Sequence, residues 1–185
     1  MSALVSIAAH VLLGVLLVAL NAEGRAEIVD TSATGFLVRH SVTAEGAPDK
    51  AYRAIIDVAR WWNPEHTYSG DAVNLSLDAR PGGCFCEKLK DGGGVMHMSV
   101  AYVAPGQAIR LVGGLGPLQG SGVAGSMAMK VSADGANTRI DLAYSVGGYW
   151  QGGFDKIAPG VNAVLGEQMG RLKTYIDTGK PTLAK

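Results

Sequence analysis

The chain lacks an excess of charge of either sign. Its 185 residues contain 16 Lys and Arg against 16 Asp and Glu, and only 17% of all residues are charged. Proteins that bind nucleic acid need clustered cations for the phosphate backbone, and no Lys/Arg cluster occurs here. We therefore expect no nucleic-acid partner. With 48% apolar residues, the composition also excludes a mainly disordered chain.

Cysteines, aromatic residues and recognisable catalytic motifs are also scarce. There are two cysteines and 6% aromatic residues, and a chain of this length buries enough surface to fold without disulfide staples. The sequence has no Gly-x-Ser-x-Gly, no phosphate-binding loop and no His-Glu-x-x-His. Cys84 and Cys86, with only His97 expected nearby, fall short of the four ligands of a zinc site. We expect no metal and no cofactor.

The N-terminal segment predicts export. Residues 3–20 are almost entirely aliphatic, and a polar stretch follows them. Gly24 and Ala26 place small side chains where a signal peptidase requires them, which predicts a signal peptide over residues 1–26. The alternative is an uncleaved membrane anchor, the one membrane contact we expect. In both cases the domain lies outside the cytoplasm, in the periplasm or secreted, and residues 27–34 form a linker.

The rest of the chain alternates apolar and polar residues, with two helical exceptions. Residues 36–43 predict a strand with Phe36, Val38, His40 and Val42 on its inner face. A helix over residues 48–60 follows, opened by Pro48. The next strands have one apolar face each, namely Val73/Leu75/Leu77, Met96/Met98/Val100/Tyr102, Ile109/Leu111, Val123/Met127/Met129/Val131 and Ile140/Leu142/Tyr144/Val146, with a mixed segment over residues 82–89. Turn-forming residues separate them, which indicates an antiparallel meander.

A long amphipathic helix ends the domain. Ala158, Val161, Leu165, Leu172 and Ile176 fall on one side of a helical wheel. Pro159 suits the first turn of this helix and Gly179 its C-terminal end, which leaves residues 179–185 as a tail. A sheet with one apolar face needs a cover, and this helix is long enough to supply it.

Three motifs, in this order, carry a family resemblance. Residues 47–52 (Ala-Pro-Asp-Lys-Ala-Tyr) open the first helix, which Trp61-Trp62 closes. Residues 82–87 (Gly-Gly-Cys-Phe-Cys-Glu) lie on a strand, and residues 105–111 (Pro-Gly-Gln-Ala-Ile-Arg-Leu) turn into another. Over residues 35–178 the chain resembles the START-like helix-grip superfamily (SRPBCC), in its polyketide cyclase/dehydrase or heat-shock ATPase-activator-like branches. The resemblance implies an α+β fold, in which a curved antiparallel sheet of about six or seven strands encloses a cavity with a long C-terminal helix.

The first functional hypothesis is that this cavity binds a small hydrophobic or amphipathic ligand without catalysis. Trp62 and His66 are expected at its entrance. Further expected contacts are Met98, Tyr102, Met127, Met129, Tyr144 and Gln168. The methionines serve equally well as core residues, and the indoles of residues 61–62 equally well pin the helix to the sheet. Gln168 lies within the apolar helix stripe and contacts either the ligand or a backbone group. The sequence does not predict an oligomeric state.

The alternative hypothesis is an enzyme of the cyclase, dehydratase or hydrolase kind, with proton transfer by His40, His66 or Glu65. His40 is expected to be buried and neutral, because burial disfavours its charged form.

Two pairs of residues are expected to be structural. A hairpin that pairs Leu89 with Val95 sets Glu87 opposite His97, and we expect a solvent-exposed pair because the neighbouring methionines point inward, with a catalytic dyad as the alternative. Cys84 and Cys86 are about 6.6 Å apart at Cα on an extended strand, the far limit for a disulfide. They are expected to be packing residues, with a redox-active bridge as the alternative.

Overall fold

The computed structural model describes residues 26–182. The predicted export segment, residues 1–26, lies outside the described residues except for its last position, so its fate stays a prediction. From residue 26 to residue 182, no helix is both long enough and apolar enough to cross a membrane.

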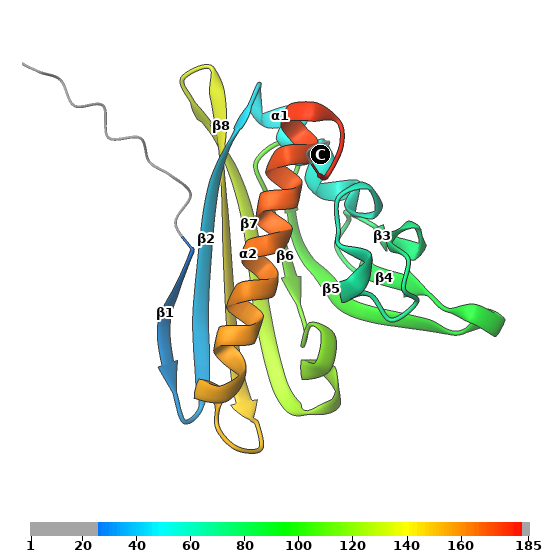
Figure 1. Ribbon diagram of the computed structural model, residues 1–185, viewed down its shortest axis with the longest axis vertical. Helices are drawn as coiled ribbons and strands as arrows, with labels where there is room; N and C mark the ends of the chain where they lie inside the picture. The colour runs from blue at the N-terminus through cyan, green and yellow to red at the C-terminus, as the bar shows by residue number, and fades with distance from the viewer. Residues whose placement is uncertain (1–25, 183–185) are drawn as a thin grey trace, which may run out of the picture.

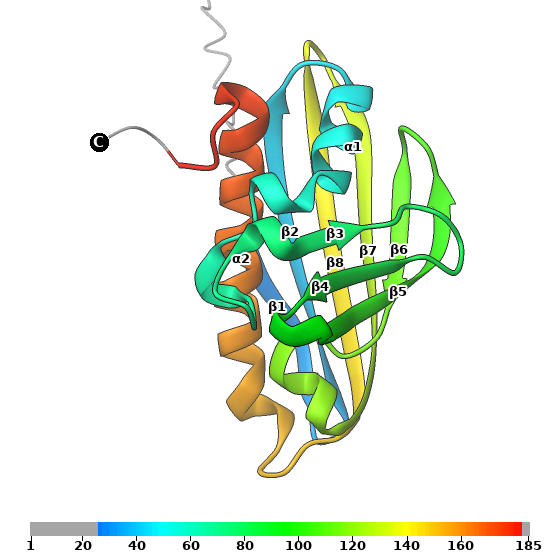
Figure 2. The same cartoon turned by 90° about the vertical axis from the view of Figure 1, so that its right-hand side faces the viewer.

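The described residues form one antiparallel sheet of eight strands and two α-helices, in the order β1-β2-β8-β7-β6-β5-β4-β3 across the sheet. The predicted α+β helix-grip fold is confirmed, with one strand more than expected. The strands are β1 (Ala26–Ser32), β2 (Gly35–Glu45), β3 (Leu75–Leu77), β4 (Cys84–Lys88), β5 (Gly94–Ala104), β6 (Ala108–Val112), β7 (Gly122–Asp134) and β8 (Asn137–Tyr149), and the helices are α1 (Pro48–Ile56) and α2 (Phe154–Thr178). Figure 1 shows α2 lying across one face of the sheet. In Figure 2, β3 to β5 run across the view at a steep angle to β2, β7 and β8.

Helix α2 covers the sheet with the predicted apolar stripe. Ala158, Leu165, Leu172 and Ile176 are buried, and the helix packs mainly on β2 and β1. It begins at Phe154, earlier than expected, so Pro159 lies in the second turn and not in the first. Gly179 ends the helix as predicted, with a left-handed φ of 78° and an N–H bonded to the Tyr175 carbonyl.

Helix α1 is shorter than predicted. It begins at Pro48 as expected but ends at Ile56, and a separate 3-10 turn covers Val58–Arg60. Trp61 and Trp62, which follow this turn, are both buried. The α-helix therefore ends at Ile56, four residues earlier than predicted, and the 3-10 turn separates it from the two indoles.

Two strand boundaries were predicted incorrectly. Residues 27–34, expected to be a linker, supply most of β1, which pairs with β2. This strand is short and lies at the edge of the sheet, and its sequence does not alternate apolar and polar residues, so periodicity did not reveal it. Val73, expected on the inner face of a strand, lies in the 3-10 turn Ala72–Asn74 and is 71% exposed.

Strand β5 contains two register shifts, at His97 against β4 and at Ala101 against β6. Each inserts one extra residue and so reverses which side chains point inward. The first shift leaves Met96 61% exposed while His97 and Met98 are both buried. The second turns Tyr102 outward, where it is 46% exposed. The predicted inward placement of Met96 and Tyr102 is therefore wrong, because the alternation assumed an unbroken strand.

The centre of the sheet is filled by side chains. Met98, Met127, Met129 and Tyr144 are each at most 5% exposed. The Tyr144 hydroxyl donates to the Gly113 carbonyl at 3.1 Å and accepts from the Leu115 N–H at 2.9 Å. Burial raises the pKa of Tyr144 to about 12, so its hydroxyl keeps its proton. These residues belong to the buried hydrophobic core.

Candidate functional site

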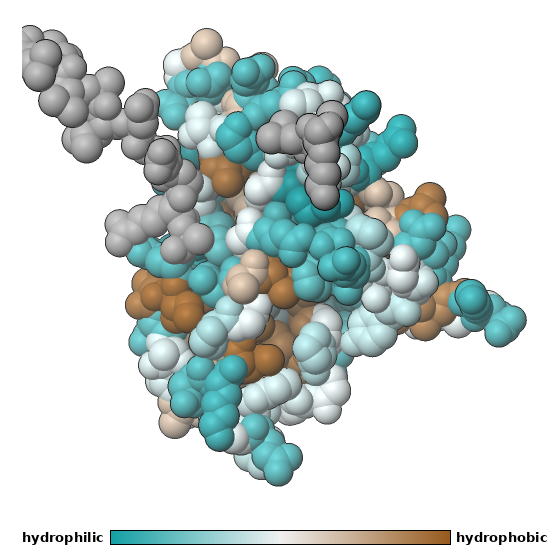
Figure 3. Space-filling view, in the orientation of Figure 1, coloured by the Kyte–Doolittle hydropathy of each residue, from teal (hydrophilic) through white to brown (hydrophobic). Residues whose placement is uncertain are grey.

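A pocket of about 490 Å³ lies beside the N-terminal half of α2. Its other walls are the segment of residues 62–68, strands β4 and β5, and the loop of residues 115–117. Figure 3 shows apolar surface gathered beside the lower half of α2. The apolar side chains that line the pocket are Trp62, Phe85, Leu115, Pro117, Ile157, Val161, Val164 and Leu165. Mostly apolar walls of this kind suit a small hydrophobic molecule.

Helix α2 holds the wall of residues 61–63 in place. Arg171 Nε donates to the Trp61 carbonyl at 2.8 Å, and the side-chain oxygen of Gln168 accepts from the Asn63 N–H at 2.8 Å. The Trp61 indole donates to the Ala54 carbonyl of α1. This segment is thereby fixed to both helices, which gives the pocket one rigid side.

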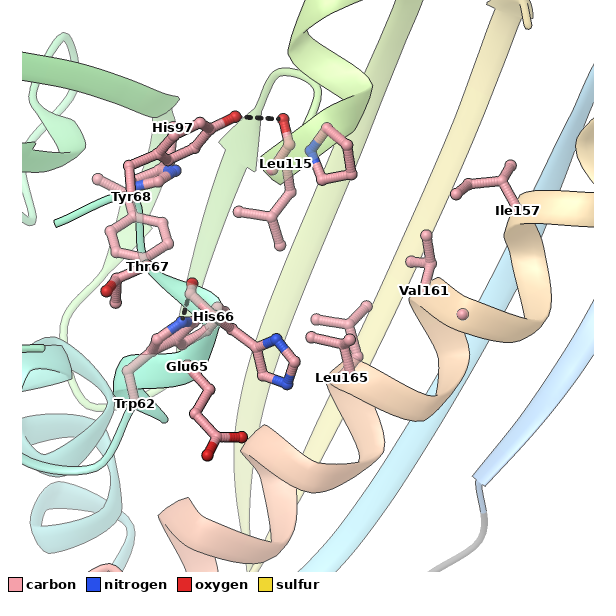
Figure 4. Close-up of a pocket in the computed structure, with 15 residues that line it drawn as sticks. Trp62, Glu65, His66, Thr67, Tyr68, His97, Leu115, Ile157, Val161 and Leu165 are labelled. Atoms are coloured by element: carbon pink, nitrogen blue, oxygen red, sulfur yellow. Dashed lines mark hydrogen bonds between the residues drawn. The ribbon is translucent and has the colours of Figure 1, made fainter. Parts of the chain in front are cut away.

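Trp62 forms the centre of that side. Its ring packs edge-on against Phe85 of β4, with 5.4 Å between centroids, and its indole N–H donates to the His66 carbonyl at 3.0 Å. Figure 4 shows Trp62 and His66 on the wall opposite Val161 and Leu165 of α2. The indole thus closes the short loop that places His66 at the rim.

The imidazole of His66 pairs with α2. Its Nε2 lies 3.1 Å from a carboxylate oxygen of Glu167, whose other oxygen accepts from the side chain of Asn63. Glu65 also lines the pocket, but His66 is partnered by Glu167 and not by Glu65. The pair is well exposed to solvent, so it contributes little stability and mainly orients the rim.

A second carboxylate and imidazole, Glu87 and His97, are buried at the inner wall. His97 Nε2 lies 2.9 Å from Glu87 Oε2, and both side chains are at most 4% exposed. Glu87 also accepts hydrogen bonds from the backbone N–H groups of Tyr68 and Ser69. The prediction of a solvent-exposed pair was wrong, because the β5 register shift turns His97 inward. Glu87 faces Val95 across the strands, not His97, and Leu89 is not paired with Val95.

The protonation states of this pair follow from its surroundings. Burial alone would raise the pKa of Glu87, but the hydrogen bonds from Ser69, Tyr68 and His97 outweigh it and lower the pKa below 4.5. Burial lowers the pKa of His97 below 6.5, although Glu87 opposes this shift. At neutral pH we therefore assign an ionised carboxylate and a neutral imidazole.

Tyr68 covers His97. The two rings lie 5.8 Å apart at their centroids, and Phe85 packs on the imidazole at 4.8 Å. The Tyr68 hydroxyl donates to the Gly116 carbonyl at 3.1 Å, a contact drawn in Figure 4. The phenol therefore bridges two walls of the pocket while remaining 55% exposed.

The pocket includes only part of the predicted site. Trp62, Glu65 and His66 line it. The predicted contacts that are absent from its lining are Met98, Tyr102, Met127, Met129, Tyr144 and Gln168, together with the proton-transfer candidate His40. Gln168 accepts a hydrogen bond from the backbone of Asn63, which is the second of the two roles expected for it. His40 is buried under α2 with its pKa lowered by burial, which confirms the expectation of a buried neutral imidazole.

Sequence reasoning missed the residues that complete the pocket. Tyr68 and Leu115 lie in loops with no periodic pattern, so nothing in the sequence indicated their direction. Ile157 precedes the predicted start of the final helix. Phe85 stood within a motif used only for the family resemblance, although its apolar ring between two cysteines was an available signal.

Cys84 and Cys86 form a disulfide. Their expected role as unbridged packing residues was wrong. Their Cα atoms are 5.4 Å apart, closer than the spacing of about 6.6 Å expected for a fully extended strand. Among residues 26–182, no group of three or more His, Cys, Asp or Glu side chains is arranged to hold a metal ion.

Comparison with known proteins identifies solved structures with a similar fold. No family model matches the chain, and no curated protein sequence matches it significantly. Solved structures do match. CalU16 from Micromonospora echinospora has a TM-score of 0.56 at 13% identity, with 86% of each chain covered.

Two further structures agree with it. An Aha1 dimer from Colwellia psychrerythraea has a TM-score of 0.54 at 18% identity, covering 78% of this chain and 98% of its own. Ara h 8.0201 has a TM-score of 0.54 at 11% identity, covering 76% of this chain and 96% of its own.

The architecture and these similarities define one class of fold. A curved antiparallel sheet closed by a long C-terminal helix is an α+β helix-grip domain. The protein shares this fold with these solved structures, which confirms the fold that the resemblance seen in the sequence implied.

Proposed function

We propose that this protein is an exported carrier that binds a small hydrophobic or amphipathic molecule, without catalysis, in the pocket beside α2. The observation that carries the proposal is the pocket itself, about 490 Å³ in volume and lined mostly by apolar side chains. Proteins of this fold bind small hydrophobic ligands, but a fold alone does not assign a function.

The size and chemistry of the pocket support a ligand of modest size. Pockets for small molecules typically measure about 300–1,000 Å³ and carry a few polar groups on apolar walls. Here the polar groups sit at two places, with His66 at the rim and His97 at the inner wall. A molecule with an apolar body and one or two polar groups fits this arrangement.

Export is supported by the sequence of residues 1–26. Cleavage before Glu27 would release a mature domain that starts within β1 and keeps every pocket residue. Expression of the full chain, followed by N-terminal sequencing of the protein outside the cytoplasm, tests this step. Recovery of the mature domain only in the cytoplasm would contradict it.

Two glycines of α2 offer a matched test of the pocket. Gly160 lines it, and a Cβ added there meets no atom within 4 Å. Gly170 is equally free of contacts but does not line the pocket. We expect Gly160→Phe to fill the pocket and to weaken the binding of 1-anilinonaphthalene-8-sulfonate at least about tenfold, a change of 1.4 kcal/mol. Gly170→Phe should leave the affinity unchanged.

Fluorescence titration and thermal shift measure both variants. Bound probe should raise the unfolding temperature of the wild type, because a ligand that binds the native state stabilises it. Equal affinities of the two variants, or a complete lack of binding by this probe and by lipophilic compounds from an expression host, would overturn the proposal.

A further inference from the structure

We propose that His97, oriented by Glu87, is a ligand-recognition residue that accepts a hydrogen bond from a hydroxyl group on the bound molecule. The inference rests on the proposed function and assigns the chemical class of the ligand, an apolar molecule that carries a hydroxyl. It is carried by one polar atom at the pocket wall that has no partner.

That atom is Nδ1 of His97. The side chain is 4% exposed, and Nδ1 is buried without a hydrogen-bond partner among the described residues. A buried polar atom without a partner costs roughly 1–3 kcal/mol, and most native proteins avoid it. His97 also lines the pocket, so a ligand can supply the missing partner.

Glu87 decides which kind of group Nδ1 can bind. An ionised carboxylate only accepts hydrogen bonds, so the contact at 2.9 Å requires His97 Nε2 to carry the proton. In a neutral imidazole the other nitrogen is then an acceptor. Nδ1 therefore selects a hydrogen-bond donor and disfavours an ether or carbonyl oxygen at the same place.

None of the hydrogen bonds that Glu87 accepts comes from Nδ1 of His97. The carboxylate holds the N–H groups of Tyr68 and Ser69 and the Nε2 of His97. The bond to Glu87 therefore accounts for Nε2 of His97 and leaves Nδ1 without a structural role among the described residues.

Tyr68 controls access to this atom. Its ring lies over His97, and one hydrogen bond to the Gly116 carbonyl holds its outer end. The side chain is 55% exposed, so it can rotate into solvent at small cost. Once it rotates, a flat ligand can take the place of the phenol and present its hydroxyl to Nδ1.

A pair of probes that differ in one group tests the inference. The wild-type protein should bind 4-hydroxybiphenyl about tenfold more tightly than 4-methoxybiphenyl, the difference expected for one good hydrogen bond. His97→Gln can keep the bond to Glu87 through its amide N–H, but its carbonyl acceptor is bonded to Cδ and not to Cγ, where Nδ1 stands, and we expect it to lose this preference. Met96→Gln, an exposed change on the same strand outside the pocket lining, should keep it.

A spectroscopic readout covers the case in which His97→Gln does not fold. In wild-type protein labelled with nitrogen-15, the Nδ1 resonance of His97 should shift with 4-hydroxybiphenyl and not with the ether. Equal affinities for the two probes in the wild type, or an unmoved Nδ1 resonance, would overturn the inference while leaving the carrier function intact. Failure of both probes and of 1-anilinonaphthalene-8-sulfonate to bind would remove the carrier function, and the inference with it.

Discussion

At the scale of single residues, close packing of α2 on β2 depends on one glycine. A Cβ added to Gly166 would lie 3.1 Å from Cε1 of His40, which is buried beneath the helix. Gly170, one turn further along, faces open space. A side chain therefore fits at Gly170 but not at Gly166, because only Gly166 lies against His40 of β2.

This difference predicts opposite effects of the same substitution. Gly170→Ala should stabilise the protein by about 0.5–1 kcal/mol, because alanine loses less backbone entropy in a helix. Gly166→Ala should lose stability, because its methyl group would press on the buried imidazole of His40 and force it to shift. Urea unfolding at pH 8 measures both changes. An equal gain at both positions would show that His40 does not limit the approach of the helix.

At the scale of elements, β5 decides where the inner wall of the pocket lies. Its two register shifts place Met96 and Tyr102 outside and His97 inside. A regular alternation was the reasonable prediction from Met96 to Tyr102, and it failed at the two points where an extra residue enters. Bulges depend on the neighbouring strands, so the periodicity of one strand does not reveal them.

The Cys84–Cys86 disulfide on the adjacent strand should contribute little stability. The bridge closes a loop with a single intervening residue, and the chain-entropy model assigns such a short loop only about 1–2 kcal/mol. We expect the double variant Cys84→Ser, Cys86→Ser to fold and to lose no more than this.

Chemical denaturation of the double variant and the oxidised wild type checks this prediction. Thiol titration of the unreduced wild type, which should find no free cysteine at these positions, confirms that the reference is bridged. A loss of several kcal/mol would show that the bridge holds β4 in place against β5.

At the scale of the whole molecule, burial of ionisable groups makes stability depend on pH. His40 and His97 both have pKa values lowered below 6.5, chiefly by burial. The unfolded chain therefore binds protons near pH 6 that the folded chain does not bind. Glu87 and Asp141 have pKa values lowered below 4.5 and 3.8, because their hydrogen bonds outweigh the effect of burial.

The free energy of unfolding should consequently be greatest above pH 6.5 and fall in two stages on acidification. The first loss begins below pH 6.5, with a slope of up to about 1.4 kcal/mol per pH unit for each histidine. The second begins near pH 4.5, as the unfolded carboxylates take up protons. Urea unfolding between pH 8 and pH 4 measures the curve, and His97→Gln should reduce the first slope. A stability that is constant from pH 8 to pH 5 would contradict both assignments.

The sequence by itself determined the order of the elements from β2 onward and the apolar faces of β2, β6, β7, β8 and α2. These features follow from local spacing, which repeats every second residue in a strand and every 3.6 residues in a helix. The helix-grip fold was predicted from the order of the motifs that carry the family resemblance. Only the tertiary structure decided that the methionines and Tyr144 at the centre of the sheet lie outside the pocket lining, that the pocket lies to one side of α2, and that Glu87 and His97 meet beside it. These depend on bulges, loop directions and volumes shared by elements far apart in the chain, and no single segment encodes them.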